Sequence, residues 1–430
     1  MTGNLRSPIC AVLGHVDHGK SSILDAIRDS CIIAKEAGAI TQAIGASIVP
    51  VDILRKKCGK LLDAMNMKLT IPGLLFIDTP GHAAFTSLRK RGGNLADIAI
   101  LVVDINEGFK PQAIEALEIL KFYKTPFIVA ANKVDLIPGW VARDVAVLGN
   151  IQQQRPEVLT KVETRLYELV GKLSELGFES ERFDRIEDYT KQIGIVPISA
   201  KTKEGLPELM MVLTGLAQKY LEENLKLEAS GPAKGTVLEV KDEKGLGITM
   251  DVIVYDGTLR TNDQIIIGGT EAPIVTKVRA LFEPMPLAEM RDAKSKFKPV
   301  KEVTAATGVK IAAPDIKDVV AGMPVRACSK EEVDEVCDEI QKEIDEVMIS
   351  TDAEGLIIKA DTIGSLEALT NLLREKEVPI RKATVGDITK KDVTDAASNL
   401  EKDPLTAVIL GFNSTATDEV KNTNASVKIL

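Results

Sequence analysis

The stretch Gly14-His15-Val16-Asp17-His18-Gly19-Lys20-Ser21, GHVDHGKS, decides how the first part of this chain folds. It fits the phosphate-loop pattern GxxxxGK[ST], and it follows an apolar run and precedes a helix-like stretch that begins at Ser22. In this strand–loop–helix context the glycines let backbone N–H groups point at phosphate oxygens, and the helix N-terminus adds positive potential. The sequence therefore predicts that Gly14 to Ser22 bind the phosphates of a nucleoside triphosphate.

A second motif indicates which base is bound. Asn132-Lys133-Val134-Asp135 follows a strand-like run and fits the NKxD pattern. In this pattern the carboxylate of Asp135 accepts two hydrogen bonds from guanine N1–H and N2–H₂, whereas adenine offers no such donor pair. The stem of Lys133 is expected to pack over the base, and Asn132 is expected to brace the loop.

A third motif, Ser199-Ala200-Lys201, also follows an apolar run and fits the segment that contacts guanine O6 through a backbone N–H. These motifs stand in the right order along the chain. They predict a guanine-nucleotide-binding domain. The alternative interpretation is that they are ordinary turns of an unrelated α/β protein.

The composition of the 430 residues is that of a soluble chain with several domains, because 45% are hydrophobic and 27% are charged. No apolar run approaches the length of a membrane span, and the N-terminus lacks the features of a signal peptide, so we expect a cytoplasmic, monomeric protein without membrane contact. The cysteines show no CxxC spacing and are predicted to be reduced thiols. The net charge of −9 does not indicate nucleic-acid binding, although a local basic patch could provide it.

The first half of the chain alternates strand-like and helix-like segments, which predicts an α/β fold with a doubly wound, mostly parallel sheet. We predict a GTP-binding domain over residues 1–225. Its buried strands are expected at residues 8–13, 74–78, 98–104, 127–131 and 195–198. Residues 150–177 have helical spacing, and the apolar stripe of that helix is expected to pack into the core.

The second half changes character after a break at residues 229–232. Short strand-like runs punctuated by turns predict a β-barrel domain over residues 230–328, with a loop at residues 285–301 whose basic side chains either meet phosphate or are merely solvated. A connecting helix with an acidic face is expected at residues 330–348, followed by a small α/β sandwich domain over residues 350–430. The strands expected here lie at residues 234–241, 247–255, 263–267, 274–280, 355–360, 378–385 and 405–412.

These residues resemble the translational GTPases. The phosphate loop is joined by Asp78-Thr79-Pro80-Gly81-His82, and His82 stands where signalling GTPases of the Ras type usually carry glutamine. AGAITQ at residues 37–42 and DTPGHAAFTSLRKRGG at residues 78–93 are similar to translation initiation factor 5B and its bacterial counterpart, initiation factor 2. The domain order matches that family over essentially the whole chain, and the long helical insert before Ser199 resembles its archaeal and eukaryotic branch.

The resemblance implies a ribosome-dependent GTPase of translation initiation that promotes subunit joining and leaves after hydrolysis. The implied cofactors are GTP or GDP, Mg²⁺ and a monovalent cation, and the implied partners are both ribosomal subunits, ribosomal RNA and other initiation factors. The family normally continues into a long helix and a last β-barrel that grips initiator tRNA. We therefore expect a C-terminally truncated chain, with initiator tRNA bound mainly by a domain outside it.

The resemblance also assigns roles to residues. Lys20 and the backbone from Asp17 to Ser21 hold the phosphates, while Ser21 and Thr41 bind Mg²⁺. Asp78 holds the ion through water, the Gly81 N–H senses the γ-phosphate, and His82 orients the attacking water. Asp17 is a candidate ligand for a monovalent cation in place of an arginine finger. The other interpretation of Asp17 is a carboxylate that only hydrogen-bonds backbone N–H groups.

Three other functions remain open at this point. A specialised elongation factor would carry two more barrels after the GTP-binding domain, which the α/β signal of the last domain argues against. A GTP-binding scaffold without relevant hydrolysis would be indifferent to the loss of His82. An enzyme acting on a small metabolite would need a second catalytic cluster, and we find none in the sequence.

Overall fold

The computed structural model describes residues 5–28, 45–64, 69–78, 96–122, 124–220, 225, 231–243, 246–269, 272–284, 297–317, 319–345, 349–350, 355–361, 363–398, 406–417, 420 and 427–430. Its first part is a seven-stranded sheet in the order β2-β3-β1-β4-β5-β7-β6. Neighbouring strands are parallel except for the antiparallel pair β2 and β3. The strands are β1 (Ile9–Gly14), β2 (Gly45–Pro50), β3 (Gly73–Asp78), β4 (Ile98–Asp104), β5 (Phe127–Asn132), β6 (Glu179–Arg182) and β7 (Gln192–Pro197).

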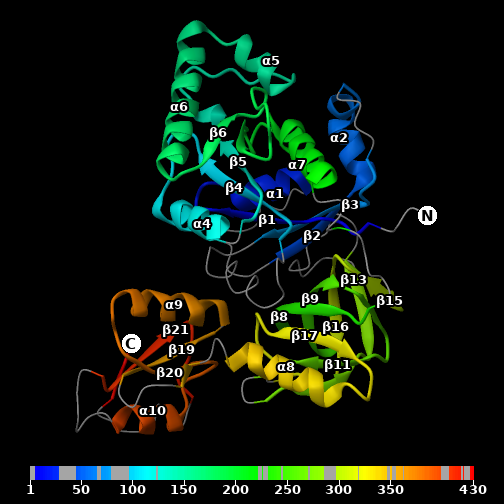
Figure 1. Ribbon diagram of the computed structural model, residues 1–430, viewed down its shortest axis with the longest axis vertical. Coiled ribbons are helices and arrows are strands. Elements are labelled where there is room, and N and C mark those ends of the chain that lie inside the picture. The colour runs from blue at the N-terminus through cyan, green and yellow to red at the C-terminus, as the bar shows by residue number, and fades with distance from the viewer. Residues whose placement is uncertain are drawn as a thin grey trace.

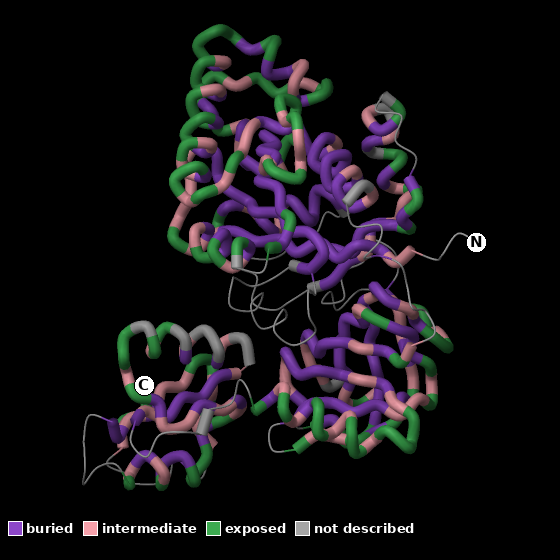
Figure 2. Tube along the Cα trace, in the orientation of Figure 1, coloured by how far each residue is buried: buried purple, intermediate pink, exposed green. Residues whose placement is uncertain are grey.

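Helices cover this sheet, as Figure 1 shows. They are α1 (Lys20–Arg28), α2 (Val51–Ala64), α4 (Pro111–Phe122), α5 (Val147–Gln152), α6 (Pro156–Glu175) and α7 (Leu206–Tyr220), with a 3₁₀ turn η2 (Val134–Leu136). Strands β1, β4 and β5 are buried along their whole length, which is the pattern expected of parallel strands covered on both faces. Figure 2 shows the same concentration of buried residues in the strands. The predicted doubly wound α/β class is confirmed.

The insert before Ser199 differs from the prediction. Residues 150–177 were expected to form one helix, but the chain forms α5 and then α6. Pro156 begins α6, because proline has no N–H to continue the hydrogen bonds of a preceding helix and fits the first helical turn. The predicted apolar stripe of α6 is buried at Val158, Val162, Leu166, Leu169 and Leu173.

The next part is a β-barrel-like unit. Its main sheet has the order β12-β11-β17-β8-β9-β16-β13-β14, and β10 pairs with β15 beside it. The strands are β8 (Lys234–Glu243), β9 (Gly247–Asp256), β10 (Thr258–Arg260), β11 (Gln264–Ile267), β12 (Ile274–Lys277), β13 (Ala280–Pro284), β14 (Phe297–Val300), β15 (Glu302–Thr304), β16 (Thr307–Ala312) and β17 (Pro324–Cys328).

Two expectations for this unit were wrong. The strand expected at residues 274–280 is two strands, β12 and β13, because the pairing partner changes between them from β11 to β16. At this change the N–H of Val278 donates to Asp263 and the N–H of Arg279 donates to Ala312. The loop expected at residues 285–301 contains β14 at its end, paired antiparallel with β13. Residues 285–296 lie outside the described part of the chain.

The acidic helix α8 (Val333–Asp345) lies along the barrel. Ile340 and Ile344 are buried against it, and Arg326 of β17 forms ion pairs with Glu339 and Glu343. The last part is a five-stranded sheet, β18-β20-β19-β21-β22, with helices α9 (Ile363–Glu375) and α10 (Lys390–Ala397). Its strands are β18 (Ile349–Ser350), β19 (Leu356–Ala360), β20 (Ile380–Val385), β21 (Val408–Phe412) and β22 (Lys428–Ile429).

An apolar contact joins the first sheet to the barrel (Figure 1). Its buried members come from β1, β2 and β3 on one side and from β8, β9 and the approach to β16 on the other. They are Ile9, Ala46, Leu75, Ile77, Leu238, Ile253 and Ala306. The predicted domain boundaries themselves stay predictions. Within the described residues, no helix has both the length and the apolar character needed to cross a membrane.

Candidate nucleotide-binding site

The phosphate loop lies at the carboxyl end of β1, between that strand and α1. Strand β1 is flanked by β3 on one side and β4 on the other, so the loop lies where the order of the sheet reverses, which is where open α/β sheets bind ligands. Gly14 has φ +140°, and a Cβ there would lie 2.3 Å from the carbonyl oxygen of Val102. Gly19 has φ +92°, and its Cβ would lie 2.5 Å from Nδ2 of Asn132. Both positions therefore require glycine.

Lys20 is held inside the loop. The residue is only 8% exposed, and its ammonium donates to the carbonyl oxygens of Gly14 and His15, both at 2.9 Å. Ser21 and Ser22 follow in the first turn of α1 and are partly exposed. Asp17 is exposed and has φ 49°, a left-handed conformation that aspartate tolerates better than most residues. The loop thus turns outward at Asp17 and returns to the helix N-terminus.

Gln112, in the first turn of α4, contacts the phosphate loop and was not predicted from the sequence. Its Oε1 lies 2.7 Å from Nδ1 of His15 and accepts the N–H of Val16 at 3.2 Å. Because a carbonyl oxygen only accepts, Nδ1 of His15 carries the proton. One amide side chain therefore fixes both the ring of His15 and the backbone beside it.

The ring of His18 is buried, with 1% exposure, and packs between the phosphate loop and the end of β4. Its Nδ1 accepts the N–H of Asp104 at 3.2 Å, so in the neutral ring Nε2 carries the proton. Burial lowers the pKa of His18, and the nearby ring of His15 lowers it further. The two rings meet edge to face with centroids 5.1 Å apart. A neutral His18 is therefore part of the packing.

Asn132 joins the phosphate loop to the third motif. Its Nδ2 donates to the carbonyl oxygen of His18 at 2.9 Å, and its Oδ1 accepts the N–H of Ala200 at 3.0 Å. This is the bracing contact expected of Asn132. Since the N–H of Ala200 is engaged in it, a contact to guanine O6 has to come from Lys201 or share the Ala200 N–H.

Lys133 is oriented by an acidic residue that sequence reasoning missed. Lys133 has φ 67°, and its Nζ lies 2.9 Å from Oδ2 of Asp104. Burial alone would raise the pKa of Asp104, but the ammonium of Lys133 and two hydrogen bonds from Asn106 lower it. The sequence signal was only that Asp104, like Asn132, directly follows a continuous apolar run; the structure places the two residues opposite each other in the parallel register.

Asp135 is also fixed by a neighbour. The hydroxyl of Ser199 donates to its Oδ1 at 2.6 Å, and the same hydroxyl oxygen accepts the N–H of Thr202 at 3.1 Å. The structure therefore brings Asn132, Lys133, Asp135 and Ser199 together beside the phosphate loop. Thr41, Gly81 and His82 lie outside the described residues, and of Asp78 only the backbone, at the end of β3, is described.

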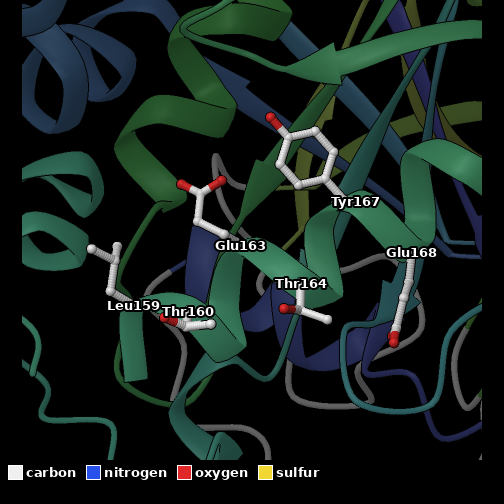
Figure 3. Close-up of a pocket in the computed structure, with 6 residues that line it drawn as sticks. All are labelled: Leu159, Thr160, Glu163, Thr164, Tyr167 and Glu168. Carbon is white, nitrogen blue, oxygen red and sulfur yellow. The ribbon is translucent and has the colours of Figure 1, made fainter. Parts of the chain in front are cut away.

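Two surface hollows lie away from this site. One, of about 650 Å³, is lined by six residues of α6 alone, and Figure 3 shows their side chains spread along that helix. The other, of about 600 Å³, lies at the amino ends of β4, β5 and β7, the opposite end of the strands from the phosphate loop. Neither contains a residue of the predicted motifs.

Comparison with known proteins identifies the family. Residues 5–219 match the model for the elongation factor Tu GTP binding domain, residues 247–326 match elongation factor Tu domain 2, and residues 327–430 match translation-initiation factor 2. The chain is 58% identical to a probable translation initiation factor IF-2 of Methanopyrus kandleri, over 97% of this chain and 70% of that protein. The chain belongs to the translation initiation factor IF-2 family.

Other members of the IF-2 family agree. A probable translation initiation factor IF-2 of Thermococcus sibiricus is 56% identical over 95% of this chain and 69% of its own length. The crystal structure of GDP-bound aIF5B from Aeropyrum pernix is 51% identical, with a TM-score of 0.83, and the match covers 99% of this chain and 72% of that one. The resemblance stated from the sequence is confirmed: this member of the IF-2 family is a translational GTPase, and its last domain is of the initiation-factor type.

Proposed function

We propose that this chain binds GTP and GDP with the phosphates at Gly14 to Ser22 and the base between Lys133, Asp135 and the loop at Ser199. The observation that carries the proposal is Asn132, which bonds the carbonyl of His18 and the N–H of Ala200 at once. One side chain thereby sets the distance between the phosphate loop and the loop at residues 199–202, which we call the base-reading loop. The GDP-bound state of the Aeropyrum pernix relative supports the same ligand here.

The residue roles follow from the chemistry of phosphoryl transfer, which needs positioning and neutralisation of charge. Lys20 and the backbone from Asp17 to Ser21 hold the β- and γ-phosphates. The hydroxyl oxygen of Ser21 suits a hard cation, and Mg²⁺, when bound, neutralises charge on the phosphate oxygens. Thr41 and, through water, Asp78 would hold the same ion.

The remaining roles concern hydrolysis itself. The N–H of Gly81 detects the γ-phosphate, and His82 orients the attacking water. Asp17 belongs to the phosphate loop and is exposed, so its carboxylate is available to hold a monovalent cation beside the phosphates.

The family supports a role on the ribosome during initiation. With GTP the factor promotes joining of the two ribosomal subunits, and it leaves after hydrolysis. We expect contacts with ribosomal RNA and with other initiation factors in the cytoplasm, and initiator tRNA bound mainly through a domain outside this chain. The γ-phosphate orders Thr41 and Gly81 with their segments, and these flank the strands β2 and β3 that pack on the barrel.

Multiple-turnover GTP hydrolysis with and without matched ribosomal subunits tests this proposal. We expect slow hydrolysis alone, stimulation by ribosomes, no ATP turnover, and loss of the stimulated rate in His82→Ala with GDP affinity unchanged. Ribosome-independent turnover, or full stimulation in His82→Ala, would contradict the assigned mechanism. GTP binding without any stimulated hydrolysis, in this chain and in a longer homologue alike, would favour a scaffold.

A further inference from the structure

A buried carboxylate lies directly beyond the base-reading loop and takes part in none of the roles above. Glu204 is 6% exposed and follows Lys201 by three residues. Its two oxygens accept four hydrogen bonds, and a carboxylate has about four acceptor sites, so its hydrogen-bonding capacity is filled. The donors are Trp140 Nε1 at 3.2 Å, Arg143 N at 3.3 Å, Thr202 Oγ1 at 2.6 Å and Nδ2 of Asn150.

Three of these donors belong to the insert that follows Asp135, and they are held in place by each other. Asn150 is fully buried, and its Oδ1 accepts from Arg143 Nη1 at 2.7 Å and from Gln154 Nε2 at 2.8 Å. Gln154 in turn bonds both the N–H and the carbonyl of Val141. The insert therefore presents a fixed set of donors to Glu204.

The fourth donor leads to the base. Thr202 gives its hydroxyl to Glu204 and its N–H to Ser199 Oγ, and that hydroxyl donates to Asp135 at 2.6 Å. The backbone adds a second link, because the N–H of Ser199 donates to the carbonyl of Glu204 at 2.9 Å. An unbroken path of hydrogen bonds thus runs from the insert through Glu204 to the carboxylate of Asp135.

We propose that Glu204 is a positioning residue for guanine recognition: it fastens the loop at residues 199–202 to the insert and so fixes Ser199 and Asp135. The inference rests on the proposed binding of guanine at Asp135. Guanine uses two donors on that carboxylate and hypoxanthine uses one, since it lacks the 2-amino group. If Asp135 is displaced, guanine therefore loses more binding free energy than hypoxanthine.

The affinities of GDP and inosine diphosphate measure this effect. We expect Glu204→Ala to reduce the preference for GDP over inosine diphosphate by about tenfold, the value of one hydrogen bond to a charged group. Thr202→Val, at an exposed position, keeps the hydrogen bonds from Glu204 to the insert and the backbone bond to Ser199 but removes the side-chain link to the loop, so a smaller reduction is expected.

Glu208→Gln is the matched control. Glu208 is a buried carboxylate that also binds the insert, but it does so through the N–H of Val147, which it accepts at 2.7 Å and which lies outside the loop at residues 199–202. If the insert merely stabilises the domain, both glutamate variants lower thermal stability without changing the ratio of the two affinities. The proposal requires the ratio to change in the Glu204 and Thr202 variants only.

Trp140 provides an independent readout, because it is the single tryptophan among the 430 residues and its indole N–H bonds Glu204. We expect GDP to change its fluorescence in the wild type and in Glu208→Gln, and to change it less in Thr202→Val. An unchanged preference for GDP in a folded Glu204→Ala, or in Thr202→Val where the former does not fold, overturns the inference. A wild type that binds neither diphosphate overturns the proposed function instead.

Discussion

The base end and the phosphate end of the proposed nucleotide site are built from different kinds of contact. At the base end, side chains bond side chains: Asp135 with Ser199, and Lys133 with Asp104. At the phosphate end most contacts involve the main chain, since Lys20 bonds loop carbonyls and Val16 gives its N–H to Gln112, which also bonds the ring of His15. In the proposed site, recognition of the base therefore depends on residue identity, whereas phosphate binding depends on a backbone shape that a few side chains hold.

His18 connects the two ends of the site, and we call it the joint. Its carbonyl oxygen accepts from Asn132 on the base side, and its ring accepts the N–H of Asp104 below the loop. A change at the base end should alter which base is bound, and a change at the phosphate end should alter all nucleotides alike. This contrast can be tested with substitutions at each end and at the joint.

The largest effect is expected at the base end. Asp135→Asn replaces one acceptor with a donor, so guanine loses up to two charged hydrogen bonds and GDP affinity falls about 10²- to 10⁴-fold. Xanthine carries a carbonyl where guanine has its amino group, so the variant should bind xanthosine diphosphate better than GDP. Competition binding with both diphosphates measures the exchange.

Asp188→Asn is the control for that substitution. Asp188 is a partly exposed aspartate of the same domain that bonds Thr190 in its own turn. It should leave both affinities unchanged. Equal weakening of GDP and xanthosine diphosphate by Asp135→Asn would mean that Asp135 does not read the base, and the contrast between the ends would fail.

The sequence identified the residues proposed for the base end, but it did not identify the neighbouring residues that hold them. The motifs containing Asn132, Asp135 and Ser199 can be recognised in the sequence because each follows an apolar strand, and the structure brings them together. Asp104 and Gln112 belong to no motif, and their contacts depend on sheet register and on where α4 begins. Glu204 depends on the path of the insert, which local periodicity does not specify.

The sequence likewise predicted some elements of the fold and missed others. Buried parallel strands such as β4 were predicted to the residue, since continuous apolar runs need no partner to be recognised. The polar edge strand β6, Glu179–Arg182, carries no such run and was missed. Helix α10 was missed although Thr389 and Asp392 form a capping box there, because its first turn is otherwise polar.

A smaller effect is expected at the phosphate end. Gln112→Ala removes the acceptor shared by His15 and Val16, at a cost of about 1 kcal/mol, or about fivefold in affinity. Because this contact is remote from the base, GDP, GTP and inosine diphosphate should weaken by the same factor, mainly through faster dissociation. Stopped-flow dissociation of labelled GDP measures it.

Gln218→Ala is the matched control, since Gln218 of α7 likewise accepts a backbone N–H, that of Thr70, away from the site. It should leave nucleotide dissociation unchanged. A Gln112→Ala protein that altered the ratio of GDP to inosine diphosphate would show that the two ends are not separable.

The smallest effect is expected at the joint, as a dependence of stability on pH. Burial lowers the pKa of His18, so the unfolded chain, whose histidines titrate near about pH 6.5, takes up a proton before the folded ring does. The stability associated with the neutral ring is complete above that pH and is lost as the pH falls toward the lowered pKa of the folded state. The lowered pKa of Asp104 acts in a more acidic range, so the two contributions are separable.

His18→Asn tests this assignment, because an amide oxygen can replace Nδ1 as acceptor for the N–H of Asp104 without titrating. The free energy of unfolding, measured by denaturant at about pH 7.5 and about pH 5.5, should fall less in this variant than in the wild type. His15→Asn, at the partly exposed ring that Gln112 holds, should keep most of the wild-type difference. Equal losses in the wild type and His18→Asn would place the titrating group elsewhere. The joint would then connect the two ends through the carbonyl of His18 alone.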